Sequence, residues 1–263
     1  MHAIAYERRR LTSVRSTWLV LVGLLLADAA VAALTARQPA LAEPVRVLTA
    51  GVPLLPLPLA AIAAGAVGAL SYGHEIRYPV LRAHLRPAVR RFQLLAAKLT
   101  VVGVFSAAAA ALTLAVDGLA LHFLAPHTSV RQFEHALVSG QVPAALLGYL
   151  AAAVAGGWTG LLGAALLRSA AAGLLLVVSL PVLAEPVVRA LLDHRQLAAD
   201  GLGALRWSRL FPVDMQHAWL YGPLSGLPGA AGLSRLELGA LVGGPVLALF
   251  LVYALLLPRR STV

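Results

Sequence analysis

The stretch GHEIRYPVLRAHLRPAVRRFQLLAAK, residues 73–98, lies between two long apolar runs and carries six of the chain's 21 basic residues. Its leucines and arginines recur at helical spacing, which is the pattern of an amphipathic helix at a membrane surface. Pro87 interrupts the pattern, so we expect a short helix from about Glu75 to Leu85 and a second helix that begins near Pro87. This stretch either docks a soluble partner or is a basic cytoplasmic loop that only fixes topology.

The overall composition predicts that the rest of the chain is embedded in a membrane. Hydrophobic residues make up 60% of the 263 residues, and charged residues only 12%. Several apolar runs reach the roughly 18 to 20 residues that cross a bilayer as a helix, and they lack the alternation of barrel strands. Since lipid leaves only helices or closed barrels as spanning forms, the expected fold is an all-α integral membrane protein.

We expect one domain, residues 1–263, with six transmembrane helices. Their expected positions are about 17–34, 48–72, 94–116, 142–167, from 170 onward and 238–257. An interfacial helix within residues 1–16 precedes them because basic and apolar residues interleave there. We expect the first apolar run to be retained as a span, since it lacks the small-residue cleavage site of a signal peptide. Residues 117–141 and 193–237 are expected to form outer segments.

Prolines and glycines mark two of these spans. Pro53, Pro56 and Pro58 lie in the first half of the second span, where each removes a backbone donor, so we expect that half to bend or partly unwind. The fourth span carries four glycines at three- and four-residue spacing, at positions 156, 157, 160 and 163. Such spacing predicts a small-residue face for close helix packing.

The distribution of charge orients the chain in the membrane. With both termini inside, the cytoplasmic segments hold 13 of the 21 basic residues and two of the 11 acidic ones. The positive-inside rule therefore predicts cytoplasmic termini, and it accounts for the net charge of +10 without a nucleic-acid partner. Arg90, Arg91 and Lys98 are expected to anchor the third span at the interface, Lys98 by extending its side chain to the headgroups.

Several enzyme classes are excluded by the residues present. The only lysine, Lys98, follows Ala97 rather than a glycine-rich turn, so a Walker A nucleotide site is absent. His74-Glu75 begins like a zinc-protease motif, but Tyr78 stands where the second histidine would be needed. The chain has no cysteine, no serine in a nucleophile-elbow pattern, and no histidine spacing typical of a metal site. We expect no enzymatic activity, no metal and no directly bound cofactor.

Two carboxylates fall inside expected spans, Asp28 in the first and Glu185 in the fifth. Ionisable groups within a bilayer are costly, which makes both of them candidates for a translocation path. The structural alternatives are that Asp28 pairs with a polar group on a neighbouring span and that Glu185 reaches the interface or pairs with Arg189.

Three sequence features resemble permease subunits of the ABC type-2 transporter family, as found in high-GC Gram-positive bacteria. They are Arg15-Ser16-Thr17-Trp18 at the entry to the first span, Glu75 and Arg77 followed by Pro87, Arg90, Arg91 and Ala96-Ala97-Lys98, and the tail Arg259-Arg260. The resemblance covers the whole chain in order and spacing. His74 and Ile76 depart from the glycine and aromatic residue that more often flank the glutamate in that family.

The resemblance implies a half-transporter of the exporter type in the bacterial cell membrane. It would pair with a second permease subunit, the same or different, and dock two copies of a separate ATPase that consumes the ATP. Residues 2–13 would be the connecting helix, residues 74–86 the cytoplasmic coupling helix between spans 2 and 3, and residues 193–237 a re-entrant outer segment. The implied ATPase-coupling residues are Glu75, Arg77, Leu81, Arg82 and Leu85.

Two other functions are compatible with a polytopic membrane protein. An ion-coupled secondary transporter would use Asp28 and Glu185 as proton sites, although the six expected spans contain no internal repeat of the kind common in such transporters. A membrane enzyme would need a nucleophile or metal set facing a cavity, and the sequence offers none. The apolar spans do not select a substrate, nor do they decide between a homodimer and a heterodimer.

Overall fold

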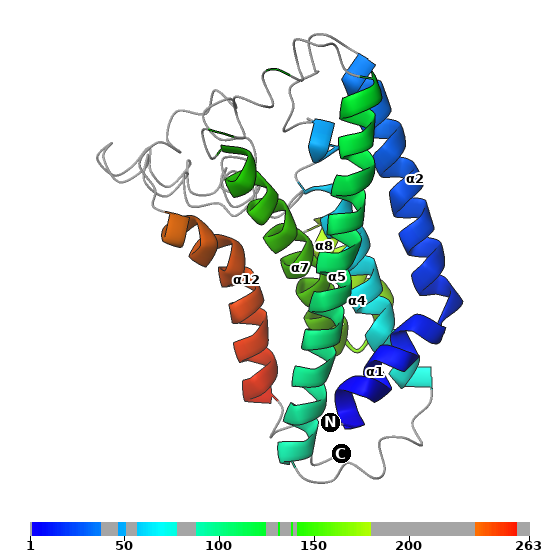
Figure 1. The fold of residues 1–263 in the computed structure, drawn as a ribbon. Coiled ribbons are helices and arrows are strands. Elements are labelled where there is room, and N and C mark those ends of the chain that lie inside the picture. The colour runs from blue at the N-terminus through cyan, green and yellow to red at the C-terminus, as the bar shows by residue number, and fades with distance from the viewer. Residues whose placement is uncertain are drawn as a thin grey trace, which may run out of the picture.

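The computed structural model describes residues 2–37, 47–50, 57–77, 88–124, 131, 138, 141–179 and 235–256. Within these ranges the chain is helical and contains no strand, so the predicted all-α class is confirmed. The helices are α1 (His2–Ser13), α2 (Arg15–Arg37), α4 (Leu59–Arg77), α5 (Ala88–Leu124), α7 (Gln141–Leu167), α8 (Ala170–Ser179) and α12 (Arg235–Leu256) (Figure 1).

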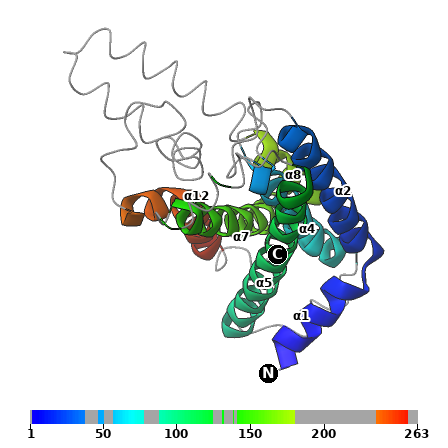
Figure 2. The same ribbon diagram turned by 45° about the horizontal axis from the view of Figure 1, so that its top comes forward.

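Helix α7 lies at the centre of the arrangement and contacts α4, α5, α8 and α12 (Figure 2). Helix α2 packs along α5 and α4, while the short helix α1 crosses one end of the bundle and contacts α5 and α2. The start of α5 and the end of α12 lie at that same end (Figure 1). This end therefore gathers α1, the two helices that flank residues 78–87, and the last described turn of the chain.

Three of the described helices are long and apolar enough to cross a membrane. They comprise residues Arg15–Arg37, Gln93–Leu124 and Ala145–Leu167. Three shorter apolar helices, Leu59–Tyr72, Ala170–Ser179 and Val246–Leu255, fall where the sequence predicts further spans. The chain thus has the helices of a membrane protein.

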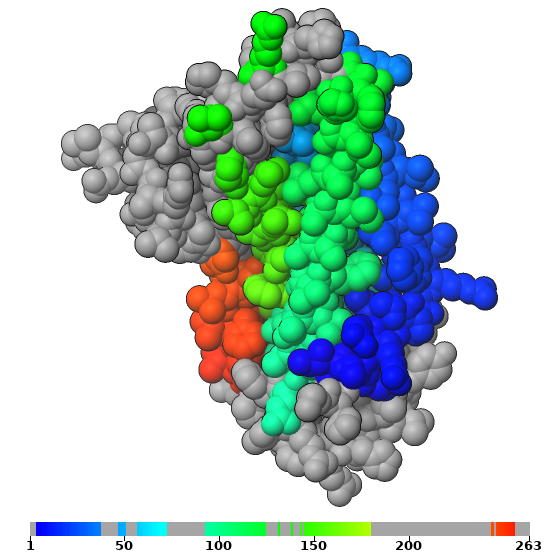
Figure 3. Space-filling view, viewed as in Figure 1, coloured from blue at the N-terminus to red at the C-terminus, as the bar shows by residue number. Residues whose placement is uncertain are grey.

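The side chains on the two faces of α2 are distributed as expected for a helix in a membrane. Its exposed face carries large apolar residues, including Leu19 at 72% and Leu26 at 68% exposure. Its buried face carries small or polar residues such as Asp28, Ala32 and Thr35. A helix on the surface of a soluble protein has the opposite distribution, whereas small and polar residues line helix interfaces in lipid. Helices α2 and α5 form much of the surface seen in Figure 3.

The glycine face predicted for the fourth span is confirmed, and its main partner is α4. A Cβ atom added to Gly156 would overlap the carbonyl group of Ala61, and one added to Gly160 would overlap the carbonyl oxygen of Gly65. The backbones of α4 and α7 are therefore in direct contact, which only residues without a side chain permit.

The short turn predicted after the fourth span is also confirmed. Arg168 adopts a left-handed conformation with φ of 53°, and the Ser169 N–H donates to the Ala164 carbonyl at 3.2 Å, which closes α7 with a Schellman-type cap. The Ser169 hydroxyl then accepts the Ala172 N–H at 3.3 Å and caps the start of α8. Helix α8 consequently runs back along α7.

The second predicted span is shorter than expected. Helix α4 begins at Leu59, directly after Pro58, whereas the prediction placed the start of the span near Leu48. Residues 47–50 instead form a buried turn, in which the Ala50 N–H donates to the Val47 carbonyl at 3.1 Å. Proline cannot donate to the helical ladder and is tolerated at a helix start, which explains why α4 begins directly after Pro58.

The separate helix predicted from Glu75 to Leu85 is wrong in its first part. Helix α4 continues without a break through Glu75 to Arg77, and residues 78–87 lie outside the described part of the chain. The physical reason is that Gly73 is the only weak helix former near this point, and a single glycine in a helix costs only about 1 kcal/mol relative to alanine. The predicted start of the next helix near Pro87 is confirmed, since α5 begins at Ala88.

Apart from the end of α5, which lies at Leu124 rather than near residue 116, the remaining boundaries agree with the sequence to within a few residues. Helix α1 covers the residues assigned to a connecting helix, and α12 begins at Arg235, just inside the predicted outer segment 193–237. The rest of that segment, with Glu185 and the tail Arg259-Arg260, lies outside the described residues.

Candidate functional site

A stripe of buried polar residues runs along one face of α5. Lys98, Ser106, Thr113 and Asp117 are all buried and follow one another at spacings of eight, seven and four residues, which keeps them on one side of the helix. Lys98 and Asp117 are 19 residues apart, or about 28 Å along the helix axis. Since the hydrocarbon core of a bilayer is about 30 Å thick, the stripe extends over nearly the whole of that thickness.

One end of the stripe is an acidic pair formed by Asp28 of α2 and Asp117 of α5. Both residues have 0% of their surface exposed. The Asp117 carboxyl group and the Thr113 hydroxyl are the polar groups that interact with the Asp28 carboxyl group. The polar group on a neighbouring helix that lies beside Asp28 is therefore another carboxyl.

The position of Asp117 corrects a second prediction. The sequence assigned Asp117 to the outer loop 117–141, whereas α5 continues as a helix to Leu124. The sequence does indicate that the helix continues beyond Asp117, because Leu119, Leu121 and Leu124 maintain the apolar composition of the span. Asp117 also lies one helical turn after Thr113, on the face that packs against α2 and α7.

Neither carboxyl group is satisfied by its surroundings. Thr113 Oγ1 forms a 2.8 Å hydrogen bond with the Tyr149 hydroxyl of α7, which extends the polar cluster to a third helix. None of the four carboxylate oxygens of Asp28 and Asp117 has a hydrogen-bond partner among the described residues. Buried polar groups are nearly always paired, so two adjacent unpaired carboxyl groups are an exceptional feature.

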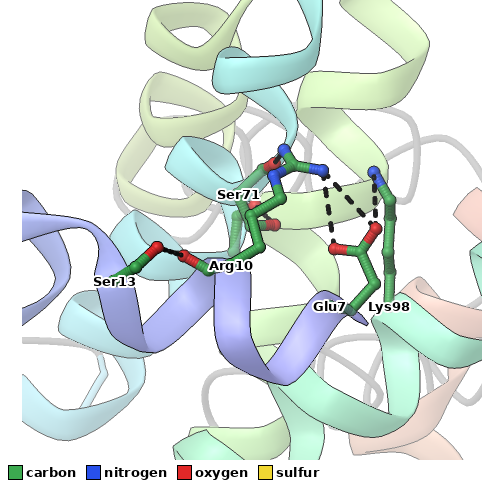
Figure 4. Close-up of polar contacts among 6 residues, drawn as sticks. Glu7, Arg10, Ser13, Ser71 and Lys98 are labelled. Atoms are coloured by element: carbon green, nitrogen blue, oxygen red, sulfur yellow. Dashed lines mark hydrogen bonds and ion pairs between the residues drawn. The ribbon is translucent and has the colours of Figure 1, made fainter. Parts of the chain in front are cut away.

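The other end of the stripe is a charged network that fixes α1 to the bundle (Figure 4). The Glu7 carboxylate lies 3.4 Å from Arg10 Nη1 on the same helix and 3.9 Å from Lys98 Nζ on α5. Arg10 also donates through Nη2 to the carbonyl oxygen of Ser71 on α4. Helix α1 is thus joined to both α4 and α5, and Glu7 is buried where it makes these contacts.

Lys98 has a different environment from the predicted one. Its side chain is 4% exposed and packs between α1 and α4, with Nζ 5.9 Å from the centroid of the Tyr72 ring. It therefore does not extend to lipid headgroups, because the Glu7 carboxylate supplies a partner inside the protein. Arg90 and Arg91, the other two predicted anchors, lie in the first turn of α5.

An apolar cavity of about 660 Å³ opens between α5, α7 and α12. Trp158 and Phe250 line it, and the indole N–H of Trp158 donates to the Leu99 carbonyl at 2.8 Å. The cavity lining contains no charged residue, and neither Asp28 nor Asp117 belongs to it. The acidic pair and the cavity are therefore separate features.

The predicted ATPase-coupling residues are only partly within the described chain. Glu75 and Arg77 belong to the last turn of α4, while Leu81, Arg82 and Leu85 lie in the segment 78–87 outside it. The described residues contain no group of three histidine or acidic side chains that could hold a metal ion. No protein-family model, curated protein or solved structure matches the chain.

Proposed function

We propose that this protein is the permease subunit of an ATP-driven exporter of the ABC type in the cell membrane. It forms the translocation path with a second permease subunit, and two copies of a separate ATPase supply the energy. The proposal is supported by the resemblance of three sequence features to that family and by the set of apolar helices along the chain. In this proposal six helices cross the membrane and both termini are cytoplasmic.

The observation that carries most weight is the bracing of α4 and α5 by α1. Arg10 binds α4 through the Ser71 carbonyl, six residues before its end, and Glu7 binds α5 through Lys98, ten residues after its start. These are the two helices at either end of residues 74–86, the segment that resembles a coupling helix. A partner that displaces this segment would therefore displace α4 and α5 together, because α1 binds both helices.

The proposed topology can be tested with single introduced cysteines, because the chain itself contains no cysteine. Single cysteines at Ser13 and Arg168 should be protected from a membrane-impermeant maleimide in intact cells, whereas a cysteine at Val138 should be labelled. Ser13 and Val138 are exposed, so protection reports sidedness rather than burial. Labelling of Ser13→Cys from outside, or labelling of Val138→Cys only after permeabilisation, contradicts the topology.

The function itself is tested by purifying the tagged chain in mild detergent from the cells that naturally make it. We expect a soluble protein with a Walker A loop to co-purify in a one-to-one ratio with the permease subunits and to hydrolyse ATP. The opposite result is purification without an ATPase together with solute transport by the chain alone, driven by a proton gradient in liposomes. That outcome would favour the ion-coupled transporter.

A further inference from the structure

The energy-coupling function proposed above assigns no role to the acidic pair between α2 and α5. We propose that Asp28 and Asp117 together form a proton-binding site in the core of the bundle, in which at least one of the two carboxyl groups is protonated at neutral pH. The proposal holds whichever energy source drives the protein. It rests on the burial of the pair, on its adjacency and on the groups that face it.

Burial and adjacency disfavour two ionised groups. An isolated carboxylate taken out of water loses hydration worth many kcal/mol, so such groups are neutralised or paired with a cation. Two carboxylates side by side also repel each other, and an adjacent pair therefore retains a proton. Asp28 and Asp117 are both fully buried, and none of their carboxylate oxygens has a hydrogen-bond partner among the described residues.

The helices around the pair supply no neutralising cation in their described parts. The groups that face the pair are Thr113 from α5 and, hydrogen-bonded to it, Tyr149 from α7. The buried turn 47–50 and the first turns of α4 contain no ionisable side chain. The nearest basic residues along the two helices, Arg37 of α2 and His122 of α5, are both exposed.

The small number of acidic groups at the site favours a proton over a metal cation. The apolar cavity between α5, α7 and α12 is not lined by Asp28 or Asp117. A hard metal cation such as Ca²⁺ takes six to eight oxygen ligands, and the described residues contain no group of three histidine or acidic side chains that could hold one. A proton needs only one carboxylate oxygen, which becomes the O–H of a carboxylic acid and can donate to the neighbouring carboxyl group.

Protonation of the pair is expected to control how closely α2 and α5 pack. With a proton bound, the carboxyl groups can share a hydrogen bond across the helix interface. With the proton released, two negative charges face each other in an apolar interior, which favours separation of the helices or entry of water. The pair would thus link proton binding to a movement of α2 relative to α5.

The test is infrared spectroscopy of the purified protein in lipid at neutral pH. We expect a carboxylic-acid C=O band equivalent to one or two protonated groups per chain. The band should shift when all aspartates carry ¹³C in their carboxyl groups and should be absent from the double variant Asp28→Asn, Asp117→Asn. Glu7→Gln is the matched control and should leave the band unchanged, since Glu7 lies in the charged network at the other end of the stripe.

The isotope experiment uses the unaltered protein, so it remains decisive if the double variant does not fold. A spectrum without any ¹³C-aspartate-sensitive acid band at neutral pH overturns the proposal. A band that persists in a folded double variant also overturns it, because the proton would then reside on another aspartate.

Discussion

Replacement of Gly160 by alanine should destabilise the bundle by about 3 kcal/mol or prevent its assembly. The added methyl group would overlap the carbonyl oxygen of Gly65 on α4. That oxygen belongs to the helix backbone, so it cannot move aside as a flexible side chain could. The two helices would have to separate along their interface and lose the close backbone contact that holds them together in lipid.

The matched control is Gly243→Ala on α12. No atom lies within 4 Å of the Cβ position at Gly243, so the same substitution meets open space. It should leave stability unchanged or raise it by up to about 1 kcal/mol, because alanine is the better helix former. Unfolding by a denaturing detergent, followed by circular dichroism, compares the two variants. Equal midpoints for Gly160→Ala and Gly243→Ala would contradict the packing described for α4 and α7.

Glu75→Ala should uncouple ATP hydrolysis from the permease while leaving insertion and subunit pairing intact. Glu75 lies in the last turn of α4, which is continuous with the membrane helix. A contact made at Glu75 is therefore transmitted directly to α4, and through the α1 brace to α5. Glu75 is the only acidic residue in the basic segment 73–98, so an arginine or lysine on the ATPase is its expected partner. Removal of one charged contact at a desolvated interface costs about 2 to 5 kcal/mol.

The measurement is ATP hydrolysis by the purified complex in proteoliposomes, compared with hydrolysis by the ATPase alone. The wild-type chain should change the rate, and the Glu75→Ala chain should change it at least tenfold less. Arg82→Ala tests the adjoining segment in the same assay. Arg168→Ala is the control, because Arg168 is a basic residue of another predicted cytoplasmic turn. Wild-type coupling in both Glu75→Ala and Arg82→Ala would mean that the segment only fixes topology.

Much of the helical framework could be predicted because apolar runs, prolines and glycines act locally. The break after Leu167 and the helix start after Pro87 are examples in which a short motif determines a boundary. The prediction of a separate helix from Glu75 was wrong for an equally local reason, since the single Gly73 does not interrupt α4.

The acidic pair could not be predicted, because it depends on tertiary packing. Asp28 and Asp117 are 89 residues apart, and their contact requires both α2 and α5 to be rotated with these residues toward each other. A single sequence shows which face of a helix carries small or polar residues, but it does not show which other helix packs against that face. The Glu7–Lys98 contact is a similar case, in which a residue expected at the lipid headgroups instead packs against α1.

The most direct test of the proposed function is cross-linking between the coupling segment and the ATPase. A photoreactive maleimide attached to a single cysteine at Ala83, in a chain with no other cysteine, should form an adduct with the co-purified ATPase, and ATP should change its yield. The same reagent at Val138 should give no adduct with the ATPase, since this position is predicted on the opposite side of the membrane. The absence of an adduct at Ala83, or equal yields at the two positions, would contradict the account of this chain as an ATPase-driven permease.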